Sequence, residues 1–388
     1  MNILASLWNK SENAVERQIA EALSMEEIAR LRQFKAAWER YYGRFPKPLK
    51  VKSGQADDNI IVNLARVIVD KGVSFLFGQD IDFELDETRQ TLEEQWLQEC
   101  WNANKKMTFL QKLALNGGVC GHVFVKIVAG SPYPRLILLD PATVLPIWDP
   151  HDIERVLRYR IQYPATDPDT GKPITIRQWL ELDGAIWRIT DQVLREGRTG
   201  WETTAETVWP HPWPPIVDCQ NLPNPNEFFG LPDLAEDVLQ LNQGINFILS
   251  NLARIIRFHA HPKTWGRGFL ADQLKVAVDE TIVLPSPDAE LHNLEMESDL
   301  ASSINLFVHL REMLHETSSI PEVATGKLEN AGQLSGVALA ILYQPLLEKT
   351  EIKRLTYGDL LIELNRRLLL MRRRPQKSTI FPYTTHFC

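Results

Sequence analysis

The sequence of 388 residues is poor in cysteine, and none of its four cysteines shares the Cys-x-x-Cys spacing of metal or redox motifs. Cys100, Cys120, Cys219 and Cys388 are widely separated, so we expect reduced thiols in a cytosolic setting rather than a disulfide framework. The sequence also lacks an excess of positive charge, because 50 acidic residues outnumber 42 lysines and arginines. The resulting net charge of −8 excludes a generally basic nucleic-acid-binding protein but allows a local basic patch.

Long apolar runs are missing as well. No uncharged apolar stretch reaches the roughly 18 residues that a membrane-spanning helix needs, so we expect no membrane partner. The first ten residues lack the basic start, apolar core and cleavage site of a signal peptide. The remaining composition, 44% hydrophobic and 24% charged, is that of a globular chain long enough for two or three subdomains.

Recognisable catalytic and cofactor motifs are also absent. Gly326-Lys327 resembles the end of a phosphate-binding loop, but that motif needs glycine at position 321 and serine or threonine at position 328. The sequence has Pro321 and Leu328 there. The glycine-rich stretch 117–121 follows a predicted helix and precedes a predicted strand, the reverse of the order in dinucleotide-binding folds. We therefore expect no catalytic residue and no cofactor.

Metal ligation is not expected either. His259 and His261 offer two potential ligands, but no third or fourth ligand has a matching spacing. Asp57 and Asp58 are better interpreted as helix-capping residues than as a catalytic pair of carboxylates. Both pairs are explained by helix ends, so the sequence predicts no metal site.

Helical periodicity predicts an amphipathic helix from residue 11 to about 41, capped by Ser11. A second helix is expected to begin after Asp57 or Asp58, with Ile60 and Leu64 on its buried side. A short strand at 80–85 and helices at 88–101 and 107–117 complete the N-terminal part. Antiparallel strands follow at 121–128, 135–139, 142–148, 155–163, 174–182 and 185–189, with turns at 167–171 and 183–184.

A proline-rich bridge, residues 209–226, separates these strands from the C-terminal half. There the pattern predicts a long helix over 231–258, with Pro232 near its first position. Its apolar stripe is wider than one neighbouring helix covers. Either a large domain buries this stripe, or neighbouring subunits cover it.

A second long helix is expected from Ser298 or Asp299 to about residue 317, after an excursion over 259–297. The loop 321–336 contains three glycines and a proline, so it is expected to resist regular structure. The helix that follows contains Pro345, which predicts a kink near Gln344.

The order of several motifs resembles one known family. The motifs are residues 59–78 (NIIVNLARVIVDKGVSFLFG), 140–148 (DPATVLPIW), 230–233 (GLPD) and 335–339 (SGVAL). Over residues 35 to about 365 the chain resembles the portal proteins of tailed bacteriophages, of the type found in long-tailed siphophages. No single motif is specific, but the ordered set is.

The resemblance implies an α+β portal fold with an α/β wing, a two-helix stem, a small α/β clip, a loop and kinked helix that line the channel, and a short helical crown. By position it assigns the wing to 1–230, the stem helices to 231–258 and 298–318, the clip to 259–297, the tunnel loop to 319–336, the kinked wing helix to 337–350 and the crown to 351–388. The chain ends soon after residue 374, so this crown is shorter than in many relatives.

The resemblance to portal proteins also implies a homo-oligomeric ring, usually of twelve subunits, at one capsid vertex of the virion. This ring would be assembled in the host cytoplasm. The ring would pass double-stranded DNA during packaging and ejection. Its partners would be the major capsid and scaffolding proteins, the large terminase and then the head–tail adaptor. The implied site residues are Thr325, Lys327, Glu329, Asn330 and Gln333 in the tunnel loop, Gly326, Gly332, Gly336 and Pro345 as hinges, and Arg366, Arg367, Arg372, Arg373 and Arg374 as a basic patch of the crown.

From the residues alone, the loop around Lys327 also fits an ordinary solvated surface loop, and the arginine cluster fits a favourable helix C-terminus. In a channel, few cations are expected, because each lysine or arginine that contacts phosphate adds affinity and opposes sliding of the DNA. Two other classes of protein stay open: a phage-derived DNA-processing enzyme, and a monomeric α+β binding module that buries the stripe of 231–258 internally.

Overall fold

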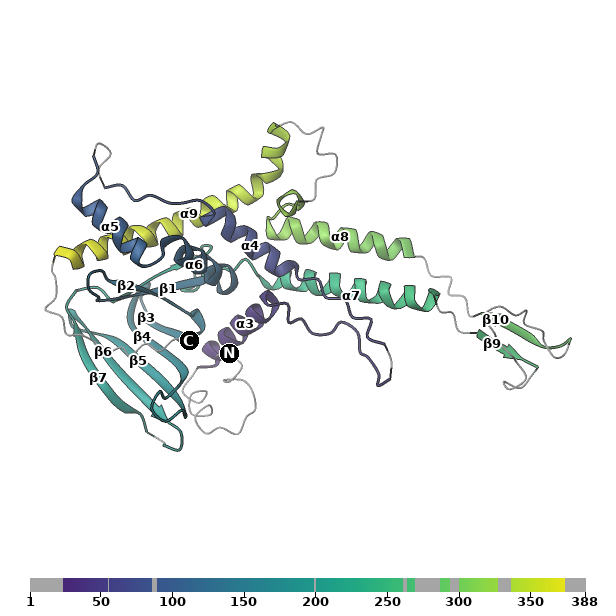
Figure 1. Cartoon of the computed structure of the whole chain (residues 1–388), viewed down its shortest axis with the longest axis horizontal. Helices are drawn as coiled ribbons and strands as arrows, with labels where there is room; N and C mark the ends of the chain where they lie inside the picture. Colours follow the sequence, from purple (N-terminus) through teal and green to yellow (C-terminus); the bar gives the residue numbers. More distant parts are fainter. Residues whose placement is uncertain are drawn as a thin grey trace.

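The computed structural model describes residues 24–54, 56–85, 89–198, 200–260, 264–268, 287–293, 300–326 and 336–373. Figure 1 shows a body of helices and sheets from which two long antiparallel helices project as a rod, with a small hairpin beyond the end of the rod. The helices are α3 (Met25–Tyr41), α4 (Leu64–Phe77), α5 (Leu92–Ala103), α6 (Lys106–Cys120), α7 (Glu236–Ala260), α8 (Leu300–Ser318) and α9 (Gly336–Arg373), with short 3₁₀ turns η1 (Pro141–Thr143) and η3 (Glu322–Thr325).

The strands form three antiparallel sheets. β1 (His122–Val128) lies between β2 (Arg135–Leu139) and β8 (Ile216–Gln220), and it is apolar and almost wholly buried because the body covers both of its faces. The larger sheet is a meander of β3 (Val144–Asp149), β4 (Asp152–Thr166), β5 (Pro173–Asp183), β6 (Ile186–Arg195) and β7 (Glu202–Trp209). The hairpin beyond the rod pairs β9 (Thr264–Arg267) with β10 (Glu290–Asn293).

Two predicted turns join neighbouring strands of the meander. Gly171 and Gly184 adopt φ angles of +67° and +65°, a left-handed conformation that glycine adopts without steric cost. Thus the turns at 167–171 and 183–184 are confirmed, as are the strands on either side of them. Four described strands escaped prediction. β7 is largely exposed and polar, β8 lies inside the expected proline-rich bridge, and β9 and β10 lie within the expected excursion over 259–297.

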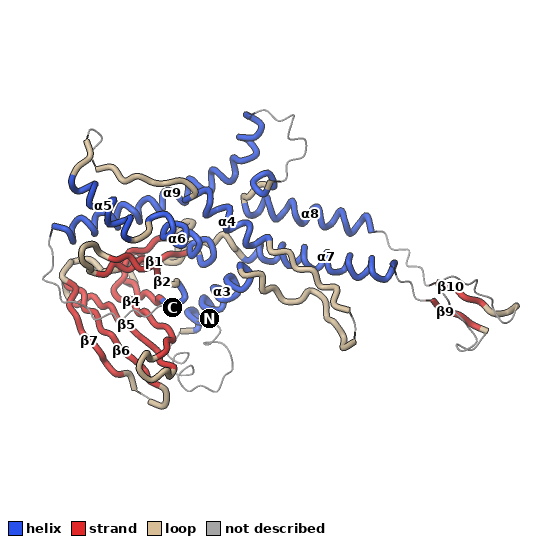
Figure 2. Tube along the Cα trace, in the orientation of Figure 1, coloured by secondary structure: helices blue, strands red, loops and turns tan. Residues whose placement is uncertain are grey.

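The main core lies between the three-stranded sheet, the inner face of the meander and helices α5, α6 and α9 (Figure 2). Trp101 and Tyr357 are among its largest fully buried side chains. The Trp101 Nε1 donates a hydrogen bond of 2.7 Å to Asn365 Oδ1, so α5 and α9 are joined by a satisfied polar contact inside the core. The C-terminal half of α9 is therefore an integral part of the body.

Several predicted element boundaries were wrong. The first described helix begins at Met25, where Ser24 and Glu27 form a capping box, and the expected cap Ser11 lies outside the described residues. No strand forms at 80–85. α7 begins at Glu236 rather than 231, so Pro232 precedes the helix. α9 runs from Gly336 to Arg373, so one helix spans the position at which the resemblance places the boundary between the kinked wing helix and the crown.

The largest boundary error concerns the start of α4. Asp57 and Asp58 do not cap it, because the helix begins at Leu64 and Asn63 accepts the capping hydrogen bond. Residues 56–63 are extended instead, and Ile60 is 39% exposed rather than buried. The cause is that side chains of α7 bind the backbone amides of this segment, which a helix would otherwise use.

Candidate functional site

A polar ladder on α7 holds the extended segment before α4. Asn242, Asn246 and Ser250 are spaced by four residues on one side of the helix, and all three are buried. Ser250 Oγ accepts from the Ile60 N–H at 2.9 Å, and Asn246 Oδ1 accepts from the Val62 N–H at 2.8 Å. Asn242 accepts from the Ala65 N–H at 3.0 Å and donates to the Val62 carbonyl at 2.9 Å.

This ladder works because two geometries match. Ile60 and Val62, two extended residues apart, advance about 6.6 Å, and Ser250 and Asn246, four helical residues apart, advance about 6 Å, so the two steps match. Asn242, one turn farther along α7, then reaches Ala65 at the start of α4. Farther along α7, Arg257 forms two hydrogen bonds of 2.7 and 2.6 Å with Asp58. These hydrogen bonds lower the pKa of Asp58, the residue that had been interpreted as a cap. The segment therefore follows α7 along most of its length.

The end of α8 carries the turn that leads into the predicted tunnel loop. Arg311 Nε lies 2.6 Å from Glu322 Oε1, which ties the helix to η3. His315 Nδ1 lies 2.7 Å from the Ile320 carbonyl, and it must be the donor because a carbonyl only accepts. Thr325 Oγ1 donates to the Glu322 carbonyl, and Gly326 ends the turn with a φ of +89°. The base of the loop is thus fixed by several side chains.

Only part of the predicted loop site lies within the described residues. Thr325 and Gly326 belong to the anchored turn, and Gly336 is the first residue of α9. The other loop and hinge residues lie outside the description: Lys327, Glu329, Asn330, Gly332 and Gln333. Pro345 lies inside α9, and Figure 2 shows α9 changing direction in its N-terminal part, which contains this residue.

A buried charge cluster joins α9 to both rod helices. Asp233, just before α7, lies 2.5 Å from Lys353 Nζ and 3.1 Å from Lys349 Nζ. Lys349 Nζ also donates to the carbonyl of Ser318, the last residue of α8, at 3.0 Å. Burial by itself would raise the pKa of Asp233, but the charges of Lys353 and Lys349 outweigh it and hold that pKa below its usual value. We call Asp233, Lys349 and Lys353 the charge cluster.

Sequence reasoning missed this charge cluster. Asp233 was noted only as the last residue of a motif, and a carboxylate beside a helix start is usually exposed. The available signal was the spacing of Lys349 and Lys353, which places two cations on the same side of α9 as the buried residues Leu346, Tyr357 and Leu360. A lysine on an apolar side of a helix needs a buried partner.

The predicted basic patch does not form one exposed surface. Arg367 is buried and donates to Glu363 and to the carbonyls of Pro214 and Ile216. Arg366 pairs with the same glutamate, and Arg372 donates to the carbonyl of Leu92. The side chain of Arg373 and all of Arg374 lie outside the described residues. Arg367 and Arg372 therefore attach α9 to the body, whereas Arg366 pairs within its own helix.

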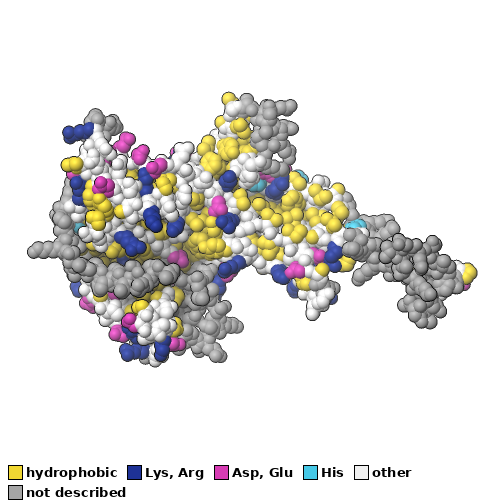
Figure 3. All heavy atoms as spheres, in the orientation of Figure 1, with side chains coloured by type: hydrophobic (Ala, Val, Ile, Leu, Met, Phe, Trp, Pro, Cys, Tyr) yellow, Lys and Arg dark blue, Asp and Glu magenta, His cyan; other side chains and the backbone are white. Residues whose placement is uncertain are grey.

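The rod has an apolar flank that nothing in the described chain covers. Figure 3 shows hydrophobic side chains gathered over α7 and α8 and over the first part of α9. The inner side of α7 is buried against α4 and α8, as Val238 and Ile245 show. The uncovered residues are Phe247, Ile256 and Phe258 on α7, Ile304, Leu306 and Met313 on α8, and Val337, Ile341 and Leu342 on α9. They lie on two sides of the rod, because Ile304 and Leu306 on α8 are two residues, and so about 200°, apart around the helix, as are Ile256 and Phe258 on α7. We call these nine residues together the rod flank.

The hairpin beyond the rod presents an aromatic pair. Trp265 is 47% exposed and stacks on His292 with ring centroids 5.1 Å apart. Arg267 pairs with Glu290 at 2.6 Å across the two strands. Within the part of the chain that the structure describes, no three histidine, cysteine or acidic side chains form a metal-ligating group, and no helix is long and apolar enough to cross a membrane.

Together these features define an α+β protein with a projecting two-helix rod that exposes several large apolar side chains. The model of one family, described as phage portal protein, SPP1 Gp6-like, matches residues 22–379, and the chain belongs to this family. One similar solved chain comes from a structure titled "Virion of native gene transfer agent (GTA) particle". It is 12% identical over 90% of this chain and 91% of that chain, with a TM-score of 0.38. No curated protein matches.

Family membership confirms the predicted class of protein. Phage portal proteins are structural proteins of the virion, and they associate as rings with the capsid. The predicted mixed α and β fold and the predicted location in the virion are confirmed with it.

Proposed function

We propose that this chain forms a ring, twelve subunits in its functional state, that serves as the channel for double-stranded DNA at one capsid vertex. The rod flank carries this proposal. Isolated apolar side chains are common on protein surfaces, but nine along adjoining helices, distributed over two sides of the rod, favour contacts with other subunits on both sides. A ring places two different sides of each subunit against its neighbours, and a long rod provides two such sides.

In this arrangement the rod is the stem, the β9–β10 hairpin belongs to the clip, and the loop after Gly326 narrows the channel. The turn that precedes this loop is anchored through Arg311 and Glu322, which supports a fixed base for it. The channel acts by shape and charge and needs no catalysis of its own. The exposed Trp265 on the hairpin gives the clip an aromatic surface for the large terminase and later the adaptor, because aromatic side chains are enriched at protein contacts.

The first experiment measures the mass of the purified chain by light scattering after gel filtration, with negative-stain images of the same peak. We expect rings with a central hole. Leu306→Glu and Met313→Glu lie seven residues apart on one side of α8, and each should convert rings to smaller species because the charge would be buried between subunits. Asn305→Glu, on the exposed polar side of α8, is the matched control and should leave the rings intact.

DNA passage is tested separately, with rings of the Lys327→Ala and Pro345→Ala variants in a packaging assay that contains capsid and terminase. We expect normal ring mass and reduced packaging. A chain that stays monomeric at every concentration and in the presence of scaffolding protein would contradict the ring. Nuclease or ATPase activity of the chain alone would favour a DNA-processing enzyme instead.

A further inference from the structure

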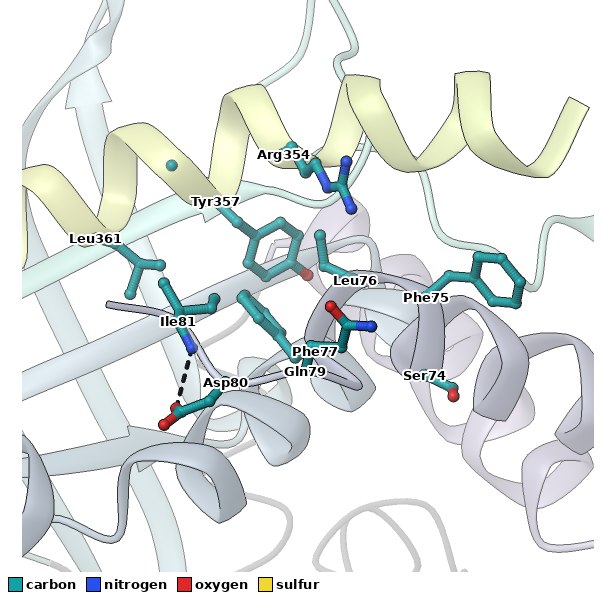
Figure 4. A pocket seen from close by; sticks show the side chains of 11 residues that line it. Ser74, Phe75, Leu76, Phe77, Gln79, Asp80, Ile81, Arg354, Tyr357 and Leu361 are labelled. Carbon is teal, nitrogen blue, oxygen red and sulfur yellow. Dashed lines mark hydrogen bonds between the residues drawn. The ribbon is translucent and has the colours of Figure 1, made fainter. Parts of the chain in front are cut away.

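A groove opens between the end of α4, residues 79–81 and the middle of α9 (Figure 4). Its volume is about 620 Å³, and its walls are mostly apolar, with Phe75, Leu76 and Ile81 on one side and Leu361 on α9. The groove lies outside the loop, hinge and rod features described above.

Gly358 lies in the wall of this groove, in the interior of α9. Glycine inside a helix costs about 1 kcal/mol relative to alanine, so this position gives up stability in the isolated chain. No steric demand within the chain explains the cost, because a Cβ at Gly358 would have no neighbouring atom within 4 Å. Leaving out a side chain allows another backbone or side chain to approach closely from outside.

The surface beside the groove is also uncovered. Leu355 and Ile362 lie three residues before and four residues after Gly358, on the same side of α9. Their side chains are 71% and 67% exposed. Ile352 and Ile341 extend this stripe toward the start of α9, where it meets the rod flank. The groove is thus continuous with the surface that we assign to contacts between subunits.

The charges around the groove argue against a small charged ligand. Arg354 is paired with Glu351 on its own helix, and Asp80 lies 2.7 Å from Lys106. Hydrogen bonding to Lys106 holds the pKa of Asp80 below its usual value, so this carboxylate is already neutralised by a partner. An apolar groove whose charged rim is paired within the chain fits the apolar surface of a protein.

We infer that this groove receives the neighbouring copy of the chain in the ring, so that the subunit contact continues from the rod into the body along α9. The inference rests on the proposed ring and specifies where a second contact lies. Gly358 gives the neighbour room to approach, and Leu355 and Ile362 pack against it.

The test compares ring assembly by Gly358→Trp, Gly358→Ala and the wild-type chain, using mass photometry over a range of concentrations. The indole of Gly358→Trp would fill the groove, and we expect it to raise the concentration for half-assembly about tenfold or more. Gly358→Ala adds one methyl group and should assemble much more readily than the tryptophan variant. Gly200→Trp, in open space before β7, is the matched control and should assemble like the wild type.

Thermal unfolding of the unassembled variants separates loss of contact from loss of fold. Gly358→Trp and Gly358→Ala should unfold at or above the wild-type temperature, because a Cβ at this position meets no neighbouring atom and helix propensity improves. Wild-type-like rings of Gly358→Trp would overturn the groove contact and leave the ring itself intact. A wild-type chain that forms no ring would overturn both.

Discussion

The two halves of α9 differ in what covers them. In the C-terminal half, Tyr357, Leu364 and Leu368 are almost wholly buried in the body. In the N-terminal half, Val337 and Ile341 are 72% and 62% exposed, although they are equally apolar. One continuous helix therefore packs one side of its C-terminal half into the body, while Leu355 and Ile362 on the other side stay exposed, and its N-terminal half is largely uncovered. The charge cluster lies where the two meet.

The largest effect should come from the charge cluster at this boundary. Asp233→Ala leaves Lys349 and Lys353 without their buried carboxylate, and we expect a loss of about 3–5 kcal/mol in the free energy of unfolding. Urea unfolding of the unassembled chain measures it. Lys353→Met should cost less, because Lys349 still pairs with Asp233. Equal losses for the two variants would show that the lysines do not share the carboxylate.

A matched pair of truncations tests the two halves of α9 directly. Leu364→Ala removes a fully buried side chain, and we expect it to lower the free energy of unfolding by about 2–4 kcal/mol. Ile341→Ala removes an exposed side chain and should change it by less than about 0.5 kcal/mol. Relative to its effect on the free energy of unfolding, Ile341→Ala should impair ring assembly more than Leu364→Ala does. If Ile341→Ala destabilises the unassembled chain as much as Leu364→Ala, the proposed division of α9 fails.

The smallest effect is on the pH dependence of stability. The pKa of Asp233 is lower in the folded chain than in the unfolded chain, so the unfolded state binds the proton more readily. The stability that Asp233 contributes is present above its unfolded pKa of about 3.9 and is lost as the pH falls through the lower folded pKa. Asp233→Asn should therefore show a shallower loss of stability below about pH 4 than the wild type. Parallel curves for the two chains would contradict this assignment.

Local patterns predicted the elements whose partners are near in sequence. The meander follows from alternating strands and glycine turns such as Gly171 and Gly184, and the long helices follow from their apolar spacing. α5 begins at Leu92 rather than at 88, because Thr91 and Glu94 form a capping box, a local signal that the predicted start did not use. These signals act over a few residues, so a single sequence contains them in full.

The errors arose where the deciding partner is distant. Residues 59–63 were expected to be helical, yet the amides of Ile60 and Val62 bond to side chains of α7 that follow 190 and 184 residues later. Arg367 is buried rather than exposed because it donates to the carbonyls of Pro214 and Ile216, and no helical pattern predicts these partners. The charge cluster unites Asp233 with lysines more than a hundred residues away. The candidate loop was located by resemblance, and its anchoring through Glu322 came only from the structure.

The polar ladder of α7 also has a mechanical consequence. The segment 60–65 runs antiparallel to the helix, and its hydrogen bonds to Ser250, Asn246 and Asn242 cross between the two at successive levels. A load along the rod acts on this junction in shear and stretches all of these bonds together, whereas peeling would break them one after another. The hydrogen bonds of the ladder therefore share the tension along the rod. Because the segment continues directly into α4, this helix transmits the force to the body.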